Sequence, residues 1–169
     1  MIRNILLFVF SCFISTLSAQ EIVGMKDIYL DNGLIYKVSD NTLFSGQAQK
    51  VRKNGHLVYE DYFEHGYILK TVVYYNGTDE PVPAQLVEYY DKSFVVKKET
   101  NYGFEKPLTE IKHFDKNGKK SLVEEYESGK LIYRCEYVNN KKHGIEYCLD
   151  KNGKELRIPY RNGKKVKTN

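Results

Sequence analysis

The sequence has no tryptophan and few prolines and glycines, 4 and 12 respectively in 169 residues. This scarcity excludes collagen-like and proline-rich chains. A content of 41% hydrophobic and 28% charged residues also excludes a disordered tail and a polytopic membrane protein. No window of 11 residues or more has a convincing helical period, and no helix-start signal precedes an apolar stripe. We therefore expect one domain, or one row of small repeats, built without helices.

Recognisable catalytic and metal-binding motifs are missing as well. The chain contains no nucleophile elbow, zincin helix, Walker loop or dinucleotide fingerprint. Its four histidines are scattered, and none lies at metal-ligand spacing from another histidine or a cysteine. Adjacent carboxylates such as Glu124 and Glu125 would face opposite sides of a strand. We expect no catalytic residue, no metal site and no cofactor.

Tyrosine is abundant, with 15 residues beside 8 phenylalanines. So many tyrosines in a polar chain indicate strands with one wet face, because Tyr suits a half-buried pleated surface. Short runs of strand-forming residues recur along the chain. They include Leu57–Phe63, Leu69–Tyr75, Leu86–Tyr90, Leu108–Phe114, Leu122–Tyr126 and Leu131–Val138. The composition and these runs predict a soluble all-β protein.

Asn-Gly pairs mark turns at regular spacing. They end at Gly33, Gly55, Gly77, Gly118, Gly153 and Gly163. The first three lie 22 residues apart, and Gly66 and Gly129 lie half a step beyond the nearest pair, so a turn falls about every 11 residues. Asn-Gly is the strongest short hairpin signal, because both residues tolerate the positive φ of a type I′ turn. The pattern predicts a single elongated antiparallel meander of about twelve strands.

Residues 1–19 have the organisation of a secretory signal peptide. Arg3 supplies the positive region, Ile5–Leu17 an apolar run, and Ser18–Gln20 a small-residue exit. The run is too short for a spanning helix. We expect cleavage after Ala19 or Gln20, which leaves residues 20–169 as one exported domain with a net charge of about +3. The alternative is a lipoprotein signal with the lipid on Cys12, although Phe10 fits that motif poorly.

Two cysteines, Cys135 and Cys148, remain after this cleavage in an oxidising compartment. They flank the turn Asn139–Gly144, for which two registers are open. In one register Cys135 faces Cys148, and a disulfide is possible if the strands come unusually close. In the other, shifted by one residue, Cys135 meets Tyr147 and the two cysteines lie free on opposite faces.

Two segments of the chain resemble variant MORN repeats. One runs from Leu43–Gly46 through Asn54–Gly55 to Glu64–Gly66, and the other from Lys141–Gly144 through Asn152–Gly153 to Asn162–Gly163. Nine residues separate the entry glycine from the turn glycine in both. Asp31–Tyr36 before Leu43–Gly46 is also similar to the start of secreted antitoxin-like proteins of the YwqK type.

This resemblance covers roughly residues 26–77 and 115–163. Ala48 and Glu146 stand where the family often has an aromatic residue, and Asn140 where it usually has glycine. The resemblance implies a ribbon-like β-sheet that contacts proteins or membranes and has no catalytic residues. The Ala-Gln exit of the signal peptide resembles that of many secreted proteins of Bacteroidetes-type bacteria.

Positive charge is concentrated at the C-terminal end. Between residues 151 and 169, Glu155 stands alone against Lys151, Lys154, Arg157, Arg161, Lys164, Lys165 and Lys167. Such an end can dock an acidic partner or an anionic lipid surface, or it can be a solvated final hairpin. Basic residues interleaved with tyrosines also occur on nucleic-acid platforms, but export disfavours that partner.

These features predict a non-enzymatic, exported protein–protein interaction module of the cell envelope, such as an accessory subunit of an envelope complex. The alternatives are an immunity-type antitoxin that binds a secreted toxin, and a module that binds glycan or lipid surfaces. The predicted locations are the periplasm, the outer membrane surface or the extracellular space. The candidate contact residues are Tyr59, Tyr62, Tyr74, Tyr89, Lys164 and Lys165.

Overall fold

The computed structural model describes residues 21–167, so the predicted signal peptide and Cys12 lie outside the described residues. One short 3-10 helix, η1 (Met25–Asp27), interrupts a chain of strands. The strands are β1 (Ile22–Gly24), β2 (Ile28–Asp31), β3 (Leu34–Lys37), β4 (Gly46–Val51), β5 (Leu57–Glu64), β6 (Tyr67–Tyr74), β7 (Pro83–Tyr89), β8 (Val96–Tyr102), β9 (Leu108–Phe114), β10 (Lys120–Glu127), β11 (Lys130–Val138), β12 (Lys141–Leu149), β13 (Glu155–Arg161) and β14 (Lys164–Lys165).

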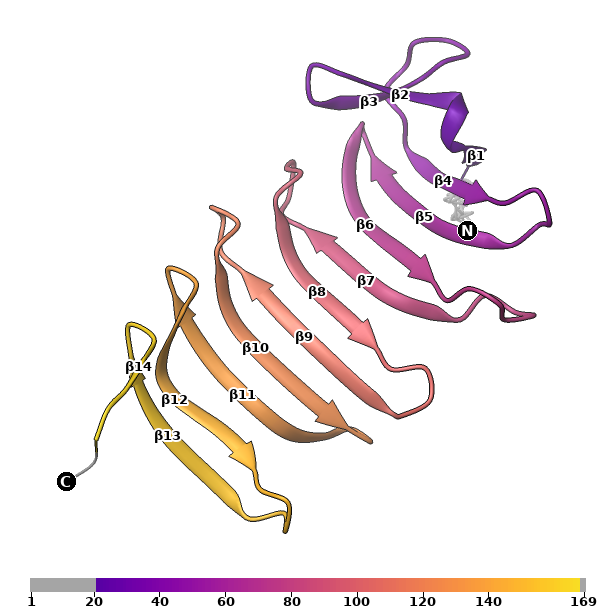
Figure 1. Ribbon diagram of the computed structural model, residues 1–169. Coiled ribbons are helices and arrows are strands. Elements are labelled where there is room, and N and C mark those ends of the chain that lie inside the picture. Colours follow the sequence, from indigo (N-terminus) through magenta and orange to yellow (C-terminus); the bar gives the residue numbers. More distant parts are fainter. Residues whose placement is uncertain (1–20, 168–169) are drawn as a thin grey trace, which may run out of the picture.

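Twelve of these strands form one open sheet in the order β1-β4-β5-β6-β7-β8-β9-β10-β11-β12-β13-β14 (Figure 1). β1 runs parallel to β4, and from β4 to β14 every neighbouring pair is antiparallel. The predicted all-β meander of about twelve strands is confirmed. A difference lies at the N-terminal end, where β2 and β3 pair with each other as a separate hairpin.

Cross-strand pairing assigns each side chain to one of two faces. Directly opposite residues on neighbouring strands point to the same side of a sheet. One row can be followed across ten strands, from β4 to β13: Gln49, Glu60, Val72, Leu86, Thr100, Ile111, Glu124, Arg134, Tyr147 and Arg157. We call the side that carries this row the open face. The opposite side, against which the β2–β3 hairpin packs, is the hairpin face.

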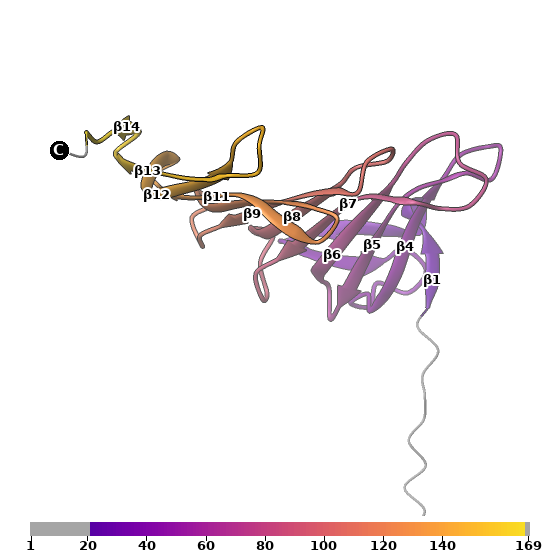
Figure 2. The ribbon, with the colours of Figure 1, turned by 90° about the horizontal axis from the view of Figure 1, so that it is seen from below.

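The main hydrophobic core lies on the hairpin face of β4, β5 and β6. Phe44 and Ala48 are fully buried there and cluster with Ile35, Phe63 and Ile68. The rings of Phe44 and Phe63 lie 5.7 Å apart. A sheet buries an apolar face only against a second element, and the β2–β3 hairpin supplies that element at this end. Figure 2 shows the remaining strands continuing as a single layer.

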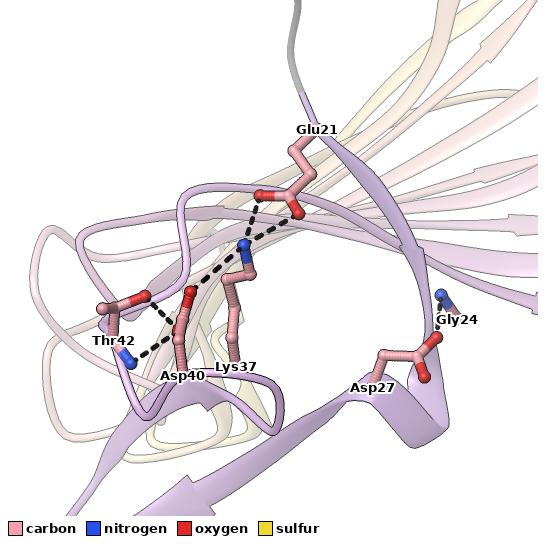
Figure 3. A network of polar contacts seen from close by, with 6 residues as sticks. All are labelled: Glu21, Gly24, Asp27, Lys37, Asp40 and Thr42. Atoms are coloured by element: carbon pink, nitrogen blue, oxygen red, sulfur yellow. Dashed lines mark hydrogen bonds and ion pairs between the residues drawn. The ribbon is translucent and has the colours of Figure 1, made fainter.

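Polar contacts hold the start of the described chain against the hairpin (Figure 3). The Lys37 Nζ atom lies 2.9 Å from the Glu21 carboxylate and 3.7 Å from the Asp40 carboxylate. Asp40 in turn accepts hydrogen bonds from the hydroxyl and the backbone N–H of Thr42, at 2.6 and 3.0 Å. The Glu21 backbone carbonyl accepts a bond from the Gln47 N–H. Together these contacts place β1 beside β4.

The Asn-Gly turns are of two kinds rather than one. Asn32–Gly33 and Asn162–Gly163 have positive φ at both residues, as a type I′ turn requires. At the other four Asn-Gly pairs only the glycine has positive φ, so the type I′ prediction is wrong there. In the identical sequences at 115–119 and 150–154, the leading residue, Asp115 or Asp150, accepts two backbone N–H bonds. These side-chain bonds stabilise a longer turn.

Both predicted registers around the cysteines are wrong. Asn139 and Asn140 form a two-residue turn with φ values of 49° and 61°, so Val138 faces Lys141. The register then shifts between Arg134 and Glu136, beside Gly144, whose φ is +72°. A turn of two residues with a later bulge replaces both the six-residue turn of the first register and the one-residue shift of the second.

The shifted register places Tyr133 opposite Cys148, so Cys135 lies diagonally across from Cys148 on the hairpin face. Diagonal Cα atoms in such a pair are about 7–8 Å apart. This exceeds the usual span of a disulfide. Both cysteines are free, Cys135 buried and Cys148 half-buried, and no Cys135–Cys148 disulfide is present.

Candidate interaction surface

The predicted contact residues do not form one surface. Tyr62 and Tyr74 lie on the open face, where both bond to Glu60. Tyr59 lies on the hairpin face opposite Val73, and Tyr89 packs against the hydrophobic core on that face. The other two residues are Lys164 and Lys165, which are exposed on β14 at the far end of the sheet.

Glu60 gathers the two open-face tyrosines into a closed network. Its carboxylate accepts the Tyr62 hydroxyl at 2.6 Å, the Tyr74 hydroxyl at 2.5 Å and the Gln49 amide at 3.1 Å, together with the Gln47 amide. Burial alone would raise the pKa of Glu60, but these hydrogen bonds outweigh it and hold the pKa below its ordinary value. Burial and the bond to Glu60 raise the pKa of Tyr62 to about 12. The network stabilises β4–β6 and leaves these hydroxyls engaged inside the protein.

A second network centred on a buried glutamate lies on the hairpin face of β11–β13. Glu146 is 6% exposed and accepts bonds from the Tyr133 hydroxyl and from Lys142. The Lys142 Nζ atom also lies over the rings of Tyr133 and Tyr160, at 5.5 and 5.2 Å from their centroids. Burial would raise the pKa of Glu146, but the bonds from Lys142 and Tyr133 outweigh it and lower the pKa. Sequence reasoning noted Glu146 only as a departure from the family pattern.

Charged side chains pair across the central strands of the open face. Lys98 pairs with Glu88, and Glu124 lies between His113 Nε2 at 3.4 Å and Arg134 Nε at 3.7 Å. These pairs are partly exposed, and each such pair contributes at most about 1 kcal/mol. The sequence does not predict these ion pairs, because only the strand register places the charged side chains next to one another.

The open face is hollowed over β11, β12 and β13. The hollow has a volume of about 620 Å³ and is lined by Leu131, Arg134, Glu136, Gly144, Ile145, Tyr147 and Arg157. Ile145 is 57% exposed although it lies in the middle of a strand, where Tyr147 is its neighbour on the same face. The bulge beside Gly144 separates β12 from β11 at this point. The result is a shallow site whose walls are apolar and cationic except for the Glu136 carboxylate, which lies 3.7 Å from Arg134.

The basic residues of the C-terminal end extend this hollow. Arg161 lies four residues beyond Arg157 on β13 and therefore on the same face, and Lys164 stands opposite Arg161. With Arg134 of β11, four cationic side chains border this end of the open face. The predicted C-terminal basic end is thus split between the faces, since Lys165 stands opposite Tyr160 on the other side.

The outer edge of β13 is poorly suited to pair with a strand of a partner protein. β14 pairs only with Tyr160 and Arg161, and the Val166 N–H bonds to the Pro159 carbonyl. Pro159 therefore directs its nitrogen, which carries no hydrogen, to the outer edge. A proline and exposed lysines are common means of blocking edge-to-edge pairing.

No family model, curated protein or solved structure matches this chain. The resemblance to MORN repeats therefore stays a prediction, whereas the structure establishes the class: an open, all-β meander of hairpins. In residues 21–167 no helix is long and apolar enough to cross a membrane. The same stretch holds no group of three or more His, Cys, Asp or Glu side chains placed to bind a metal ion.

Proposed function

We propose that this chain is a non-enzymatic interaction module, exported to the cell envelope, that holds a protein partner on its open face as an accessory subunit of an envelope complex. The proposal depends on one observation, that the open face is left uncovered by the described residues. The β2–β3 hairpin packs on the opposite face, and the open face combines exposed apolar and charged side chains. Surfaces that combine exposed apolar side chains with polar and charged ones are typical of protein interfaces.

The two most buried glutamates support a structural rather than a catalytic role. Glu60 and Glu146 are 5% and 6% exposed, and each accepts hydrogen bonds from tyrosine and from a further donor. The pKa of each carboxyl lies below its ordinary value. A general acid needs a pKa near the working pH, so both groups are poorly suited to acid catalysis. They are well suited to hold neighbouring strands of the sheet together.

Affinity purification of the tagged chain from its native envelope, followed by quantitative mass spectrometry, tests this function. We expect a stoichiometric set of envelope proteins to co-purify with the unaltered chain. Ile145→Asp should lose them, because it places a charge in the hollow. The matched control is Leu30→Asp, at an equally exposed apolar side chain (62%) on β2, and it should retain them.

Other outcomes of the same purification point elsewhere. A single small secreted toxin at one-to-one stoichiometry would replace the subunit hypothesis with the antitoxin hypothesis. A chain that purifies alone would contradict both and favour binding of glycan or lipid surfaces.

A further inference from the structure

We infer that the open face of β11–β14 is a docking surface for an acidic protein segment that also carries an apolar side chain. The docking surface consists of Arg134, Ile145, Tyr147, Arg157, Arg161 and Lys164. The inference rests on the proposed function and adds to it the place of docking and the chemistry of the partner.

The apolar part of the docking surface is Ile145 with the ring of Tyr147 beside it. Ile145 is more than half exposed, and it lies at the bulge that opens the hollow between β11 and β12. A bulge re-aims a side chain and interrupts the ladder, so it commonly marks a functional position in a sheet. A hollow of about 620 Å³ accommodates a few side chains of an inserted segment.

The cationic part consists of arginines whose ion pairs are weak. Arg157 lies 3.6 Å from Glu155, and both side chains are more than half exposed. Arg134 lies 3.7 Å from Glu124 and 3.7 Å from Glu136. All three distances exceed those of a hydrogen bond. The guanidinium forks therefore remain available for bidentate pairing with the carboxylates of a partner.

The surrounding charge favours an acidic partner. Residues 130–167, which span β11–β14, contain eleven basic side chains against Glu136, Glu146, Asp150 and Glu155. Glu146 is buried and bound to Lys142, so it offsets little of the surface charge. A field of one sign raises the rate at which an oppositely charged partner arrives, and it selects against basic partners.

A protein segment fits these observations better than a lipid surface. A lipid headgroup layer would attract the lysines of both faces and of the turns about equally, and it would not require Ile145. The arginines, the exposed isoleucine and the tyrosine instead converge on one face around a hollow. Arginine and tyrosine beside an apolar residue are the composition of interface centres.

Panning of a displayed library of random peptides on the full chain tests the inference. We expect enrichment of peptides in which Asp or Glu lies close to Leu, Ile, Val or Phe. Fluorescence anisotropy with the selected peptides should show binding weakened about tenfold or more by Arg157→Glu and by Ile145→Asp. Raising the salt from about 50 mM to about 300 mM should also weaken binding severalfold.

Two matched variants serve as controls. Arg52→Glu reverses an exposed arginine in the β4–β5 turn, and Leu30→Asp alters an exposed apolar residue on β2. Both should bind the selected peptides within about twofold of the unaltered chain. Far-ultraviolet circular dichroism and thermal unfolding of all four variants establish that each is folded.

Three results would overturn the inference. The first is enrichment without acidic residues or no enrichment at all, and the second is equal binding by Arg157→Glu, Ile145→Asp and the controls. The third is binding to phosphatidylglycerol vesicles that Arg157→Glu abolishes and Ile145→Asp leaves intact, since it would assign the surface to lipid. If envelope proteins co-purify with the unaltered chain and with both docking-surface variants, the subunit role stands, whereas docking at the hollow and with it the inference fail. If peptides bind as expected but no partner co-purifies, the surface stands and the subunit hypothesis fails.

Discussion

Replacement of Phe44 by alanine tests whether the β2–β3 hairpin provides the core for one end of the sheet. Phe44 is fully buried, and its ring contacts the cluster formed by Ile35, Ala48, Phe63 and Ile68. Truncation of a buried phenylalanine to alanine costs about 3–5 kcal/mol. The total stability of a domain is about 5–15 kcal/mol, so this one change should remove a large part of the stability at the N-terminal end.

We expect the loss to be local. The strands are arranged in one row, and each contacts chiefly its immediate neighbours. Stability in such an array is close to a sum of unit and nearest-neighbour terms. Phe44→Ala should therefore increase the opening of the hairpin and of β4–β6, while β10–β12 remain protected.

Hydrogen–deuterium exchange followed by mass spectrometry measures this difference. Amide protection should fall in residues 28–74 and stay unchanged in residues 120–149. The matched control is Phe104→Ala, because Phe104 is 60% exposed and its ring centroid lies 4.9 Å from that of Tyr75, outside the hydrophobic core. The control should cost no more than about 1 kcal/mol. Equal loss of protection along the whole chain would show that the sheet unfolds as one unit and would refute the reasoning.

Two further predictions concern buried groups. Glu60→Gln should lower the free energy of unfolding by about 1–3 kcal/mol at neutral pH, because the bonds from Tyr62 and Tyr74 lose their charged acceptor. Since the pKa of Glu60 is lowered in the folded state, its contribution is present above the ordinary value of 4.5 and lost as the pH falls through the folded pKa. Urea titrations of both proteins should converge in acid, and a constant difference down to pH 2 would contradict the assignment. For the cysteines, iodoacetamide should modify Cys148 well before Cys135 in the native chain. Cys135 is fully buried, and burial also raises the pKa of its thiol. Equal rates of modification would contradict the described burial.

The open meander could be predicted from the sequence because its signals are local. Strand runs such as Leu57–Phe63 and turn glycines at steps of about 11 residues specify where each strand begins and ends. Turn geometry was predicted less well. The side chains of Asp115 and Asp150 bond to the backbone and select a longer turn than the Asn-Gly pair alone suggests.

The candidate site could not be predicted in the same way. Tyr62 and Tyr74 are predicted contact residues, but the hydroxyls of both donate to the Glu60 carboxylate on the same face. The hollow around Ile145 depends on the bulge near Gly144, which a strict two-residue alternation does not contain. The step from Arg134 to Glu136 on β11 corresponds to four residues on β12, from Tyr147 to His143, so the pairing partners change along the strand. Register errors of this kind move whole groups of residues relative to the neighbouring strand.

The sequence by itself determined the class of fold, the approximate number of strands in the meander and the basic C-terminal end, because strand propensity, turn chemistry and charge are properties of short segments. Only the tertiary structure decided that β2 and β3 leave the sheet and cover its first strands, and that Arg134, Ile145 and Arg157 meet on the opposite face. The physical reason is that both outcomes depend on pairing between residues far apart in the chain, where burial and register select one arrangement among several that are locally equivalent.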